Sequence, residues 1–256
     1  MNNKKSFFFV ALFAFLVLVS CRKALQPEVF TVSSEKIQNC LQVSCPEIDI
    51  EYIQMKDNSE AAVKINTTLK QFVIESLYIG ESETGSTAST VEDAMANFIK
   101  LYRTHSAEFP DLAAEYFADV TVLPTYNSKH LVSISCSNYL YTGGAHGNGI
   151  TLFHNFDPKT GKSLTYEDVF TNVAIFDAIA EETFRIDNEI LANENINASG
   201  FWFENDTFSI PESFGISKEF VTLHYNPYEI AAYAAGPIII EIPISEVKNI
   251  LKIPIE

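Results

Sequence analysis

Two segments that are far apart in the sequence constrain the fold of this chain more than any other feature. Residues 139–149 read YLYTGGAHGNG, and residues 227–237 read PYEIAAYAAGP. The glycines of the first segment allow positive φ angles and the close approach of another chain or of a ligand. Strand-like runs flank this segment on both sides. It is therefore predicted to be a loop between two strands, with His146 at its apex.

The apolar residues elsewhere follow two different spacings. Period-two runs are typical of half-buried strands, and stripes at i, i+3 and i+4 are typical of helices. The helical runs lie between groups of strands and do not alternate strictly with them. This order predicts an α+β fold, a mostly antiparallel sheet with helices packed on it. Strands are expected at 48–52, 120–122, 131–141, 150–156, 220–225 and 238–242, and helices at 65–76, 90–102, 110–116, 165–190 and 245–251.

The N-terminus has the pattern of an export signal. Lys4 and Lys5 precede an apolar run, 7–19, which is shorter than the roughly 20 residues of a membrane-spanning helix. Leu18-Val19-Ser20-Cys21 resembles a bacterial lipobox. We therefore expect residues 1–20 to be a lipoprotein signal peptide, with a lipid on Cys21 that anchors the chain to a membrane. Residues 21–44, polar and aperiodic, are expected to form a tether.

Both segments resemble the signature of an extracytoplasmic domain family of unknown function. Its members include the lysozyme-sensing anti-sigma factor RsiV, the region beside the catalytic domain of the peptidoglycan deacetylase PdaC, and many bacterial lipoproteins. The resemblance implies two consecutive α+β modules, a loosely matching one at 45–125 and a closely matching one at 126–256. No linker rich in Pro or Gly separates them, and we expect one body. It also implies a place in the cell envelope, and Arg22 and Lys23 after the lipobox favour the periplasmic side.

The charge of the chain limits its partners. The formal net charge is −16, from 17 basic and 33 acidic residues. Removal of residues 1–20 takes away Lys4 and Lys5, which leaves 15 basic residues and a net charge of −18. Nucleic acid is not an expected partner, because phosphate binding needs clustered Lys and Arg. An acidic surface suits a cationic envelope protein such as lysozyme, although solubility alone also explains it.

Three cysteines remain after the lipobox. Cys40 and Cys45 are close in sequence, and an exported chain lies where disulfides persist, so they are expected to form one. Cys136 alternates with Val132 and Ile134 on the apolar face of a strand and is expected to be a small buried hydrophobe. No His or Cys spacing indicates a metal site, and no motif indicates a cofactor.

The candidate site residues come from the two segments, and each has a structural and a functional interpretation. His146 either fixes its own loop or contacts a ligand. Glu229 lies among apolar neighbours and needs a partner, and we expect His146 close to it, directly or through a tyrosine hydroxyl. The aromatic run Phe201-Trp202-Phe203 is either core or a sugar-stacking surface. The signature residues are Tyr141, Gly143, Gly144, His146, Gly147, Tyr228, Glu229 and Tyr233.

The hypothesis favoured by these observations is a lipid-anchored envelope module that binds a lysozyme-like protein or a peptidoglycan-related ligand. An alternative is a cell-wall glycan hydrolase with Glu229 and Asp157 as acid and base. A purely structural lipoprotein is the third possibility. Enzyme activity is the less favoured class, because the chain lacks a nucleophile elbow and a zinc-protease helix motif, and the deacetylase domain of its relatives is absent from it.

Overall fold

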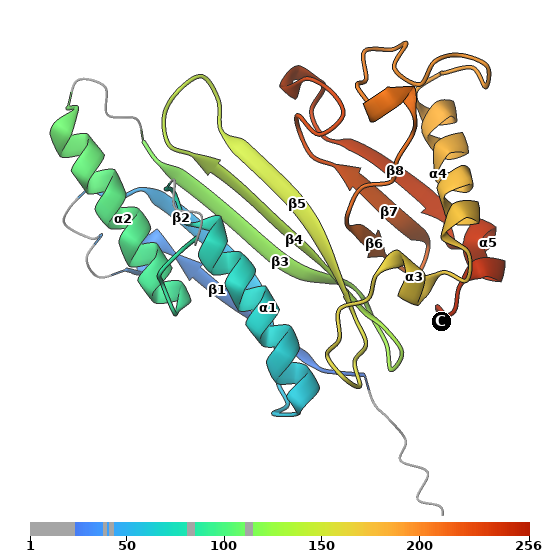
Figure 1. Cartoon of the computed structure of the whole chain (residues 1–256). Coiled ribbons are helices and arrows are strands. Elements are labelled where there is room, and N and C mark those ends of the chain that lie inside the picture. Colours follow the sequence, from blue (N-terminus) through green and yellow to red (C-terminus); the bar gives the residue numbers. More distant parts are fainter. Residues whose placement is uncertain (1–23, 38–39, 41–43, 81–84, 111–114) are drawn as a thin grey trace, which may run out of the picture.

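The structure, a computed structural model, describes residues 24–37, 40, 44–80, 85–110 and 115–256. It is an α+β fold with two sheets that follow one another along the chain, each with its own helices (Figure 1). The predicted fold class is therefore confirmed. The expected signal peptide and Cys21 lie outside the described residues. Within the described ranges, no helix is both long and apolar enough to cross a membrane.

The first sheet has five strands in the order β1-β2-β3-β4-β5. Only β2 and β3 pair in parallel, and the connection between them carries the helices α1 and α2. Parallel neighbours need such a crossover, whereas antiparallel strands can be joined by short loops. The bounds are β1 Pro27–Ser33, β2 Glu47–Met55, β3 Phe117–Asn127, β4 Val132–Tyr141, β5 Asn148–Phe156, α1 Glu60–Ser76 and α2 Val91–Glu108.

Both crossover helices begin at a capping side chain, of which only Thr90 was expected from the sequence. The Ser59 side chain accepts a hydrogen bond from the N–H of Ala62, and Thr90 accepts one from Asp93. Such caps satisfy backbone donors that lack a partner inside the helix. The helix expected from Pro110 falls largely on 111–114, outside the described residues. The apolar stripes of both helices pack on the sheet, with Ile65, Leu69, Val73, Val91, Met95 and Phe98 buried.

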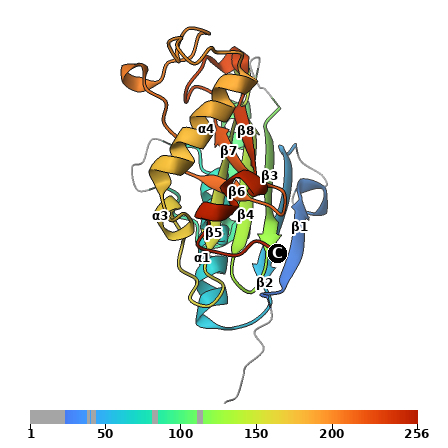
Figure 2. The same cartoon turned by 90° about the vertical axis from the view of Figure 1, so that its right-hand side faces the viewer.

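The second sheet has three antiparallel strands in the order β6-β7-β8. The helix α4 lies across it in Figure 2, and the side chains between them form a second core rich in aromatic rings. The bounds are α3 Tyr166–Val169, α4 Val173–Asp187, β6 Phe214–Ile216, β7 Phe220–Tyr225, β8 Ile238–Pro243 and α5 Ile244–Val247, with 3-10 turns at Ser34–Lys36, Glu204–Asp206, Tyr233–Ala235 and Lys248–Ile250.

The single helix predicted from Thr165 is wrong in two respects. Thr165 and Asp168 do form a capping box, but it begins only the short α3, and α4 starts separately with Asn172 as its cap. The spacing of the apolar residues also predicts a buried stripe of Ile175, Ile179, Phe184, Ile186 and Ile190. The observed buried face is displaced from it around the helix axis. Phe184 is buried as expected, whereas Ile186 is 69% exposed. The buried face of α4 is formed by Phe176, Ala180 and Phe184.

The expected tether at 21–44 is also wrong in part. Residues 27–33 form β1, which pairs with β2 along its whole length, from Pro27 opposite Met55 to Ser33 opposite Asp49. The side chains of β1 are largely exposed because it is an edge strand. This exposure explains the polar, aperiodic sequence, which gave no signal of a buried face.

The boundary expected between residues 125 and 126 falls inside β3. The strands β4 and β5 belong to the first sheet, and Val132, Ile134, Cys136 and Phe156 are part of its core. The first module therefore extends to the end of β5. The segment 139–149 lies in the first module and not, as expected, in the second.

Side-chain hydrogen bonds join the sheets. Thr125 donates from Oγ1 to the carbonyl of Ile216 at 2.8 Å, and the N–H of Ile216 donates to Ser133 at 2.9 Å. Asn155 donates to the carbonyl of Phe214 at 2.7 Å. All these contacts reach β6, a three-residue strand that the sequence did not predict. They join the modules into the single body that was expected.

Candidate functional site

The loop between β4 and β5 has the conformation that its glycines predict. Gly143 and Gly144 have φ angles of 99° and 92°. The Tyr141 hydroxyl donates to the carbonyl of Gly144 at 3.1 Å and closes the turn. At Gly147 the constraint is space, because an added Cβ would lie 2.5 Å from the ring of Tyr139 and 2.6 Å from the carbonyl of Leu140. The loop therefore depends on glycine for its conformation and for its packing.

The second signature segment is a turn closed by a carboxylate. The Glu229 carboxylate accepts a hydrogen bond from the N–H of Asn226 at 2.8 Å, and the Glu229 N–H donates to the Asn226 carbonyl at 3.0 Å. Between them, Tyr228 has a φ of 70° and a side chain that is 57% exposed. A bulky residue at positive φ costs about 1–3 kcal/mol, and such strain persists only where the surroundings enforce it.

The two signature segments meet at one end of the sheets (Figure 1). The ring of Tyr233 stacks on His146 with centroids 3.8 Å apart and an angle of 16°. Its hydroxyl donates to the carbonyl of Gly147 at 2.8 Å. Nearby, Asn226 bonds both the N–H and the carbonyl of Thr151 on β5. A side chain next to the second segment thus bonds the backbone of β5, the edge strand of the first sheet.

His146 and Glu229 form no hydrogen bond or ion pair with each other, although the two segments are in contact. The imidazole of His146 bonds the carbonyl of Gly147 at 2.8 Å and packs on Tyr233. Glu229 is exposed and caps its own turn. An exposed carboxylate keeps its hydration, so it needs no charged partner, whatever the neighbouring residues in the sequence are.

Five ring side chains form a surface that we call the aromatic platform. Trp202 is 47% exposed, and its indole N–H donates to the carbonyl of Glu229 at 3.1 Å. The ring of Tyr228 lies 5.5 Å from that of Tyr233. Next to them, Tyr139 is 43% exposed. The platform therefore consists of Tyr139, His146, Trp202, Tyr228 and Tyr233, from four separate loops and strands.

The two interpretations of the aromatic run 201–203, core or exposed surface, apply to different rings. Phe203 is buried against Phe184 and Phe208 in the second core, whereas Trp202 faces solvent.

The pKa of Tyr233 is raised, first by desolvation and then by the neighbouring Tyr139 and Tyr228. Its hydroxyl therefore remains a proton donor at neutral pH.

Beside the platform is a cavity of about 520 Å³, which we call the junction cavity. Its walls come from both signature segments and from β7. His224 on β7 has a lowered pKa because burial disfavours its charged form. Ligand sites of this size are mostly apolar with a few polar groups. The described lining residues are Asn138, Tyr139, Gly149, Ile150, Thr151, His224, Asn226, Pro227, Tyr233, Ala234, Ala235, Gly236 and Pro237.

The carboxylates of the alternative hydrolase hypothesis do not form a pair. Asp157 accepts bonds from the N–H of Lys159 and the hydroxyl of Thr160 in the turn after β5. Glu229 bonds the N–H of Asn226, and the Asn226 side chain bonds Thr151 in the first half of β5. At about 3.3 Å per residue, Thr151 and Asp157 are about 20 Å apart. Glycosidase carboxyl groups lie within about 9.5 Å of each other, so this geometry does not support that hypothesis.

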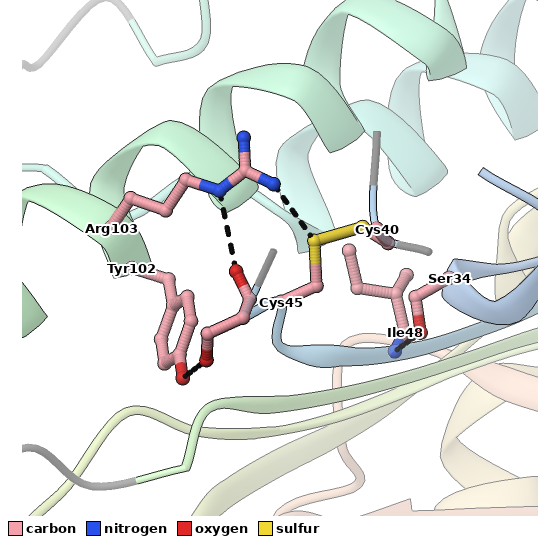
Figure 3. Close-up of a disulfide and its surroundings, with 7 residues drawn as sticks. Ser34, Cys40, Cys45, Ile48, Tyr102 and Arg103 are labelled. Carbon is pink, nitrogen blue, oxygen red and sulfur yellow. Dashed lines mark hydrogen bonds between the residues drawn. A yellow bond between two sulfur atoms is a disulfide. The ribbon is translucent and has the colours of Figure 1, made fainter. Parts of the chain in front are cut away.

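The predicted disulfide between Cys40 and Cys45 is present (Figure 3). Next to it the Arg103 guanidinium donates to the carbonyl of Ser44 and to the sulfur of Cys45. Cys136 is buried, and desolvation raises the pKa of its thiol to about 12, which makes it inert. In the described part of the chain, no three His, Cys, Asp or Glu side chains cluster in a way that would hold a metal ion.

Two family models match this chain in succession. Residues 40–149 match the family described as "Deacetylase PdaC", and residues 162–245 match the "Protein of unknown function (DUF3298)" family. The chain combines a PdaC region with a DUF3298 region. The predicted resemblance is thus confirmed. The first match ends at the beginning of β5, and the second begins after this strand.

A curated protein and two solved structures are similar to this chain. The peptidoglycan-N-acetylmuramic acid deacetylase PdaC of Bacillus subtilis is 29% identical over 129 residues, which are 49% of this chain and only 27% of that protein. A DUF3298 structure from Bacteroides fragilis has a TM-score of 0.64 and 23% identity, over 90% of this chain and 94% of the other. One from Pseudomonas aeruginosa PAO1 has a TM-score of 0.57 and 19% identity, over 89% and 94%. These structures share the fold.

Proposed function

We propose that this chain is an extracytoplasmic binding module that holds peptidoglycan glycan strands on the aromatic platform. The observation that carries the proposal is the strained, exposed Tyr228, which lies in a row of rings with Tyr233 and His146. Keeping a bulky ring in solvent at positive φ lowers stability, so the conformation points to a role for the ring. Aromatic rings offer apolar faces with polar edges, a combination that suits the faces and hydroxyls of sugars.

Two further observations support this ligand class. A curated relative is named for its action on peptidoglycan, although this chain covers only about a quarter of its length. The Cys40–Cys45 disulfide fits an oxidising compartment outside the cytoplasm, where peptidoglycan lies.

The test is the binding of purified peptidoglycan fragments to the full-length protein by calorimetry. Trp202→Ala and Tyr228→Ala are each expected to weaken binding about five- to tenfold, as the loss of one aromatic contact of about 1 kcal/mol implies. Phe109→Ala is the control, because Phe109 is also an exposed aromatic residue but lies at the end of α2. Equal affinities for all four proteins would reject the platform as the site.

A cationic protein is a second candidate ligand, and the charge of the chain favours it. The formal net charge of −16 attracts basic proteins over distances set by the ionic strength. Binding of a lysozyme-type protein is expected to weaken steeply when salt is added. Binding that does not change with salt, or no binding at low salt, would reject this candidate.

The anchor is proposed from the sequence alone. A lipid on Cys21 would hold the module to a membrane, on the periplasmic side, close to its proposed ligand. Cys21→Ser is expected to move the protein from the membrane fraction to the soluble fraction, and protease added to intact cells should leave the parent protein intact. Membrane partition of the Cys21→Ser variant, or rapid digestion of the parent, would contradict the respective part of this proposal.

A further inference from the structure

The junction cavity contains an imidazole whose hydrogen-bonding capacity is not used. His224 lines the cavity and is half-buried, and among the described residues its ring has no hydrogen-bond partner. A neutral imidazole presents one N–H donor and one nitrogen acceptor. Because burial lowers the pKa of His224, the ring is neutral at physiological pH. The two nitrogens point in different directions, so a small group in the cavity can bond one of them, as a donor or as an acceptor.

The remaining walls of the cavity are neutral and largely apolar. Ile150, Pro227 and Pro237 lie along it, and none of its described lining residues is Asp, Glu, Lys or Arg. The carboxamide oxygen of Asn138 already accepts a hydrogen bond from the N–H of Ile150 at 3.2 Å. A charged group that entered this cavity would lose its hydration without gaining a counter-ion. The walls therefore favour an uncharged group with a small apolar end.

A secondary amide with a methyl group meets these requirements. Its carbonyl can accept a hydrogen bond from the N–H of the His224 ring, or its N–H can donate to the other ring nitrogen, and its methyl group fits the apolar walls. We infer that the junction cavity takes the acetamido group of an N-acetylated amino sugar whose ring lies on the aromatic platform. This inference rests on the proposed glycan binding and adds a selectivity to it, since the same sugar with a free amine is a cation.

The experiment compares two ligands that differ only in the acetyl groups. Calorimetry with the full-length protein would use the tetramer of N-acetylglucosamine and the tetramer of glucosamine at neutral pH. The acetylated tetramer is expected to bind at least about tenfold more tightly, because a charged amine would lose its hydration in the neutral cavity without gaining a counter-ion. Bulk electrostatics predicts the reverse order, since the chain is strongly acidic. Tighter binding of the glucosamine tetramer would overturn the inference.

Variants of His224 assign the selectivity to the cavity. His224→Phe keeps a ring but removes both nitrogens and is expected to abolish the preference for the acetylated tetramer. His224→Gln keeps a donor and an acceptor and is expected to restore part of it. The control is His130→Phe, because His130 is exposed in the turn before β4. Unchanged preference in His224→Phe would overturn the assignment.

The outcomes also separate this inference from the proposal on which it rests. If both tetramers bind equally and Trp202→Ala weakens both, the platform is a glycan site and the acetamido assignment is overturned. If neither tetramer binds, the proposed function fails together with the inference. A blocked alanine peptide is a third ligand, because it carries the same amide chemistry. Displacement of the acetylated tetramer by this peptide would overturn the assignment to a sugar.

Discussion

The two sheets of this protein differ in the aromatic content of their cores and in where their backbone is strained. The first core packs two regular helices on five strands, mostly with aliphatic side chains. The second is built around Phe184, whose ring contacts Phe201, Phe203, Phe208 and Tyr225. Among the described residues, the non-glycine positions with positive φ are Glu189, Asn205, Asp206 and Tyr228, all in the second module.

This difference indicates that the two modules contribute different kinds of structure to the platform. A rigid aromatic core can hold nearby loops in unfavourable conformations, because local strain persists only where the surrounding packing enforces it. The first module contributes a regular edge, β5, and the loop with His146. The second contributes the strained turn with Tyr228 and the loop with Trp202. The platform arises where the regular module meets the strained one.

The largest expected effect tests the two cores against each other. Phe184→Ala and Phe98→Ala each remove a fully buried ring, at a cost of about 3–5 kcal/mol in the free energy of unfolding. Phe184 should lie at the upper end, because its ring contacts four others. Denaturant unfolding measures both, and Phe109→Ala serves as an exposed control that changes little. A smaller loss for Phe184→Ala than for Phe98→Ala would contradict the proposed role of the second core.

The next effect concerns the loop that the first module contributes. Gly147→Ala places a Cβ against Tyr139 and the Leu140 carbonyl, and we expect a loss of about 1–3 kcal/mol and weaker glycan binding. Gly144→Ala has free space around it but must adopt positive φ, at a cost of roughly 1–2 kcal/mol. Only Gly147 accepts the hydrogen bond from Tyr233. Glycan affinity is measured by calorimetry. Equal losses of affinity for both variants would show that the contact between Gly147 and Tyr233 does not matter for binding.

A third variant separates strain from stability in the second module. Tyr228→Gly removes the ring and relieves the positive φ, while it gives the unfolded chain more freedom. The relief of strain stabilises the folded state, and the added freedom stabilises the unfolded state. The two effects offset each other, so the free energy of unfolding should stay within about 1 kcal/mol of the parent value. Glycan affinity should fall nonetheless. A strongly destabilised variant, or one with full affinity, would show that Tyr228 is a structural residue.

The smallest effect is a pH dependence shared by the two modules. Burial lowers the pKa of His154 on β5 and of His224 on β7, so the folded state favours their neutral forms. The unfolded chain binds these protons from about pH 6.5 downward, and stability should therefore fall as the pH is lowered through and below that value. Unfolding curves of His154→Phe and His224→Phe should each be flatter between pH 5 and 7 than the parent curve. Unchanged slopes would contradict this assignment.

Much of the fold is predictable from local patterns. The alternation of Ile48 and Ile50, the caps at Thr90 and Thr165, and the glycines of the β4–β5 loop each indicate the structure that forms. What local patterns missed depends on tertiary contacts. The edge strand β1 has no buried face, and the three-residue β6 is too short for a periodic signal but gains side-chain bonds from the first sheet.

The candidate site was predicted only in part, for a related reason. The sequence correctly indicated that the two signature segments meet, but it assigned the contact to His146 and Glu229. The observed contact is between His146 and Tyr233, because Glu229 is exposed and has its own backbone partner. The contribution of Trp202 was also undecided, since its exposure depends on Phe203 turning into the core. Its position within an Asn-rich break was the available signal.

The central claim is that the two signature segments form one glycan-binding surface. Its most direct test is the titration of isotopically labelled protein with soluble peptidoglycan fragments, followed by NMR chemical shifts. The account predicts that the shifts of Trp202, Tyr228, Tyr233 and His146 move together with one dissociation constant, while those of Phe109 do not move. Shifts confined to residues far from the platform, or none at saturating fragment concentration, would contradict it.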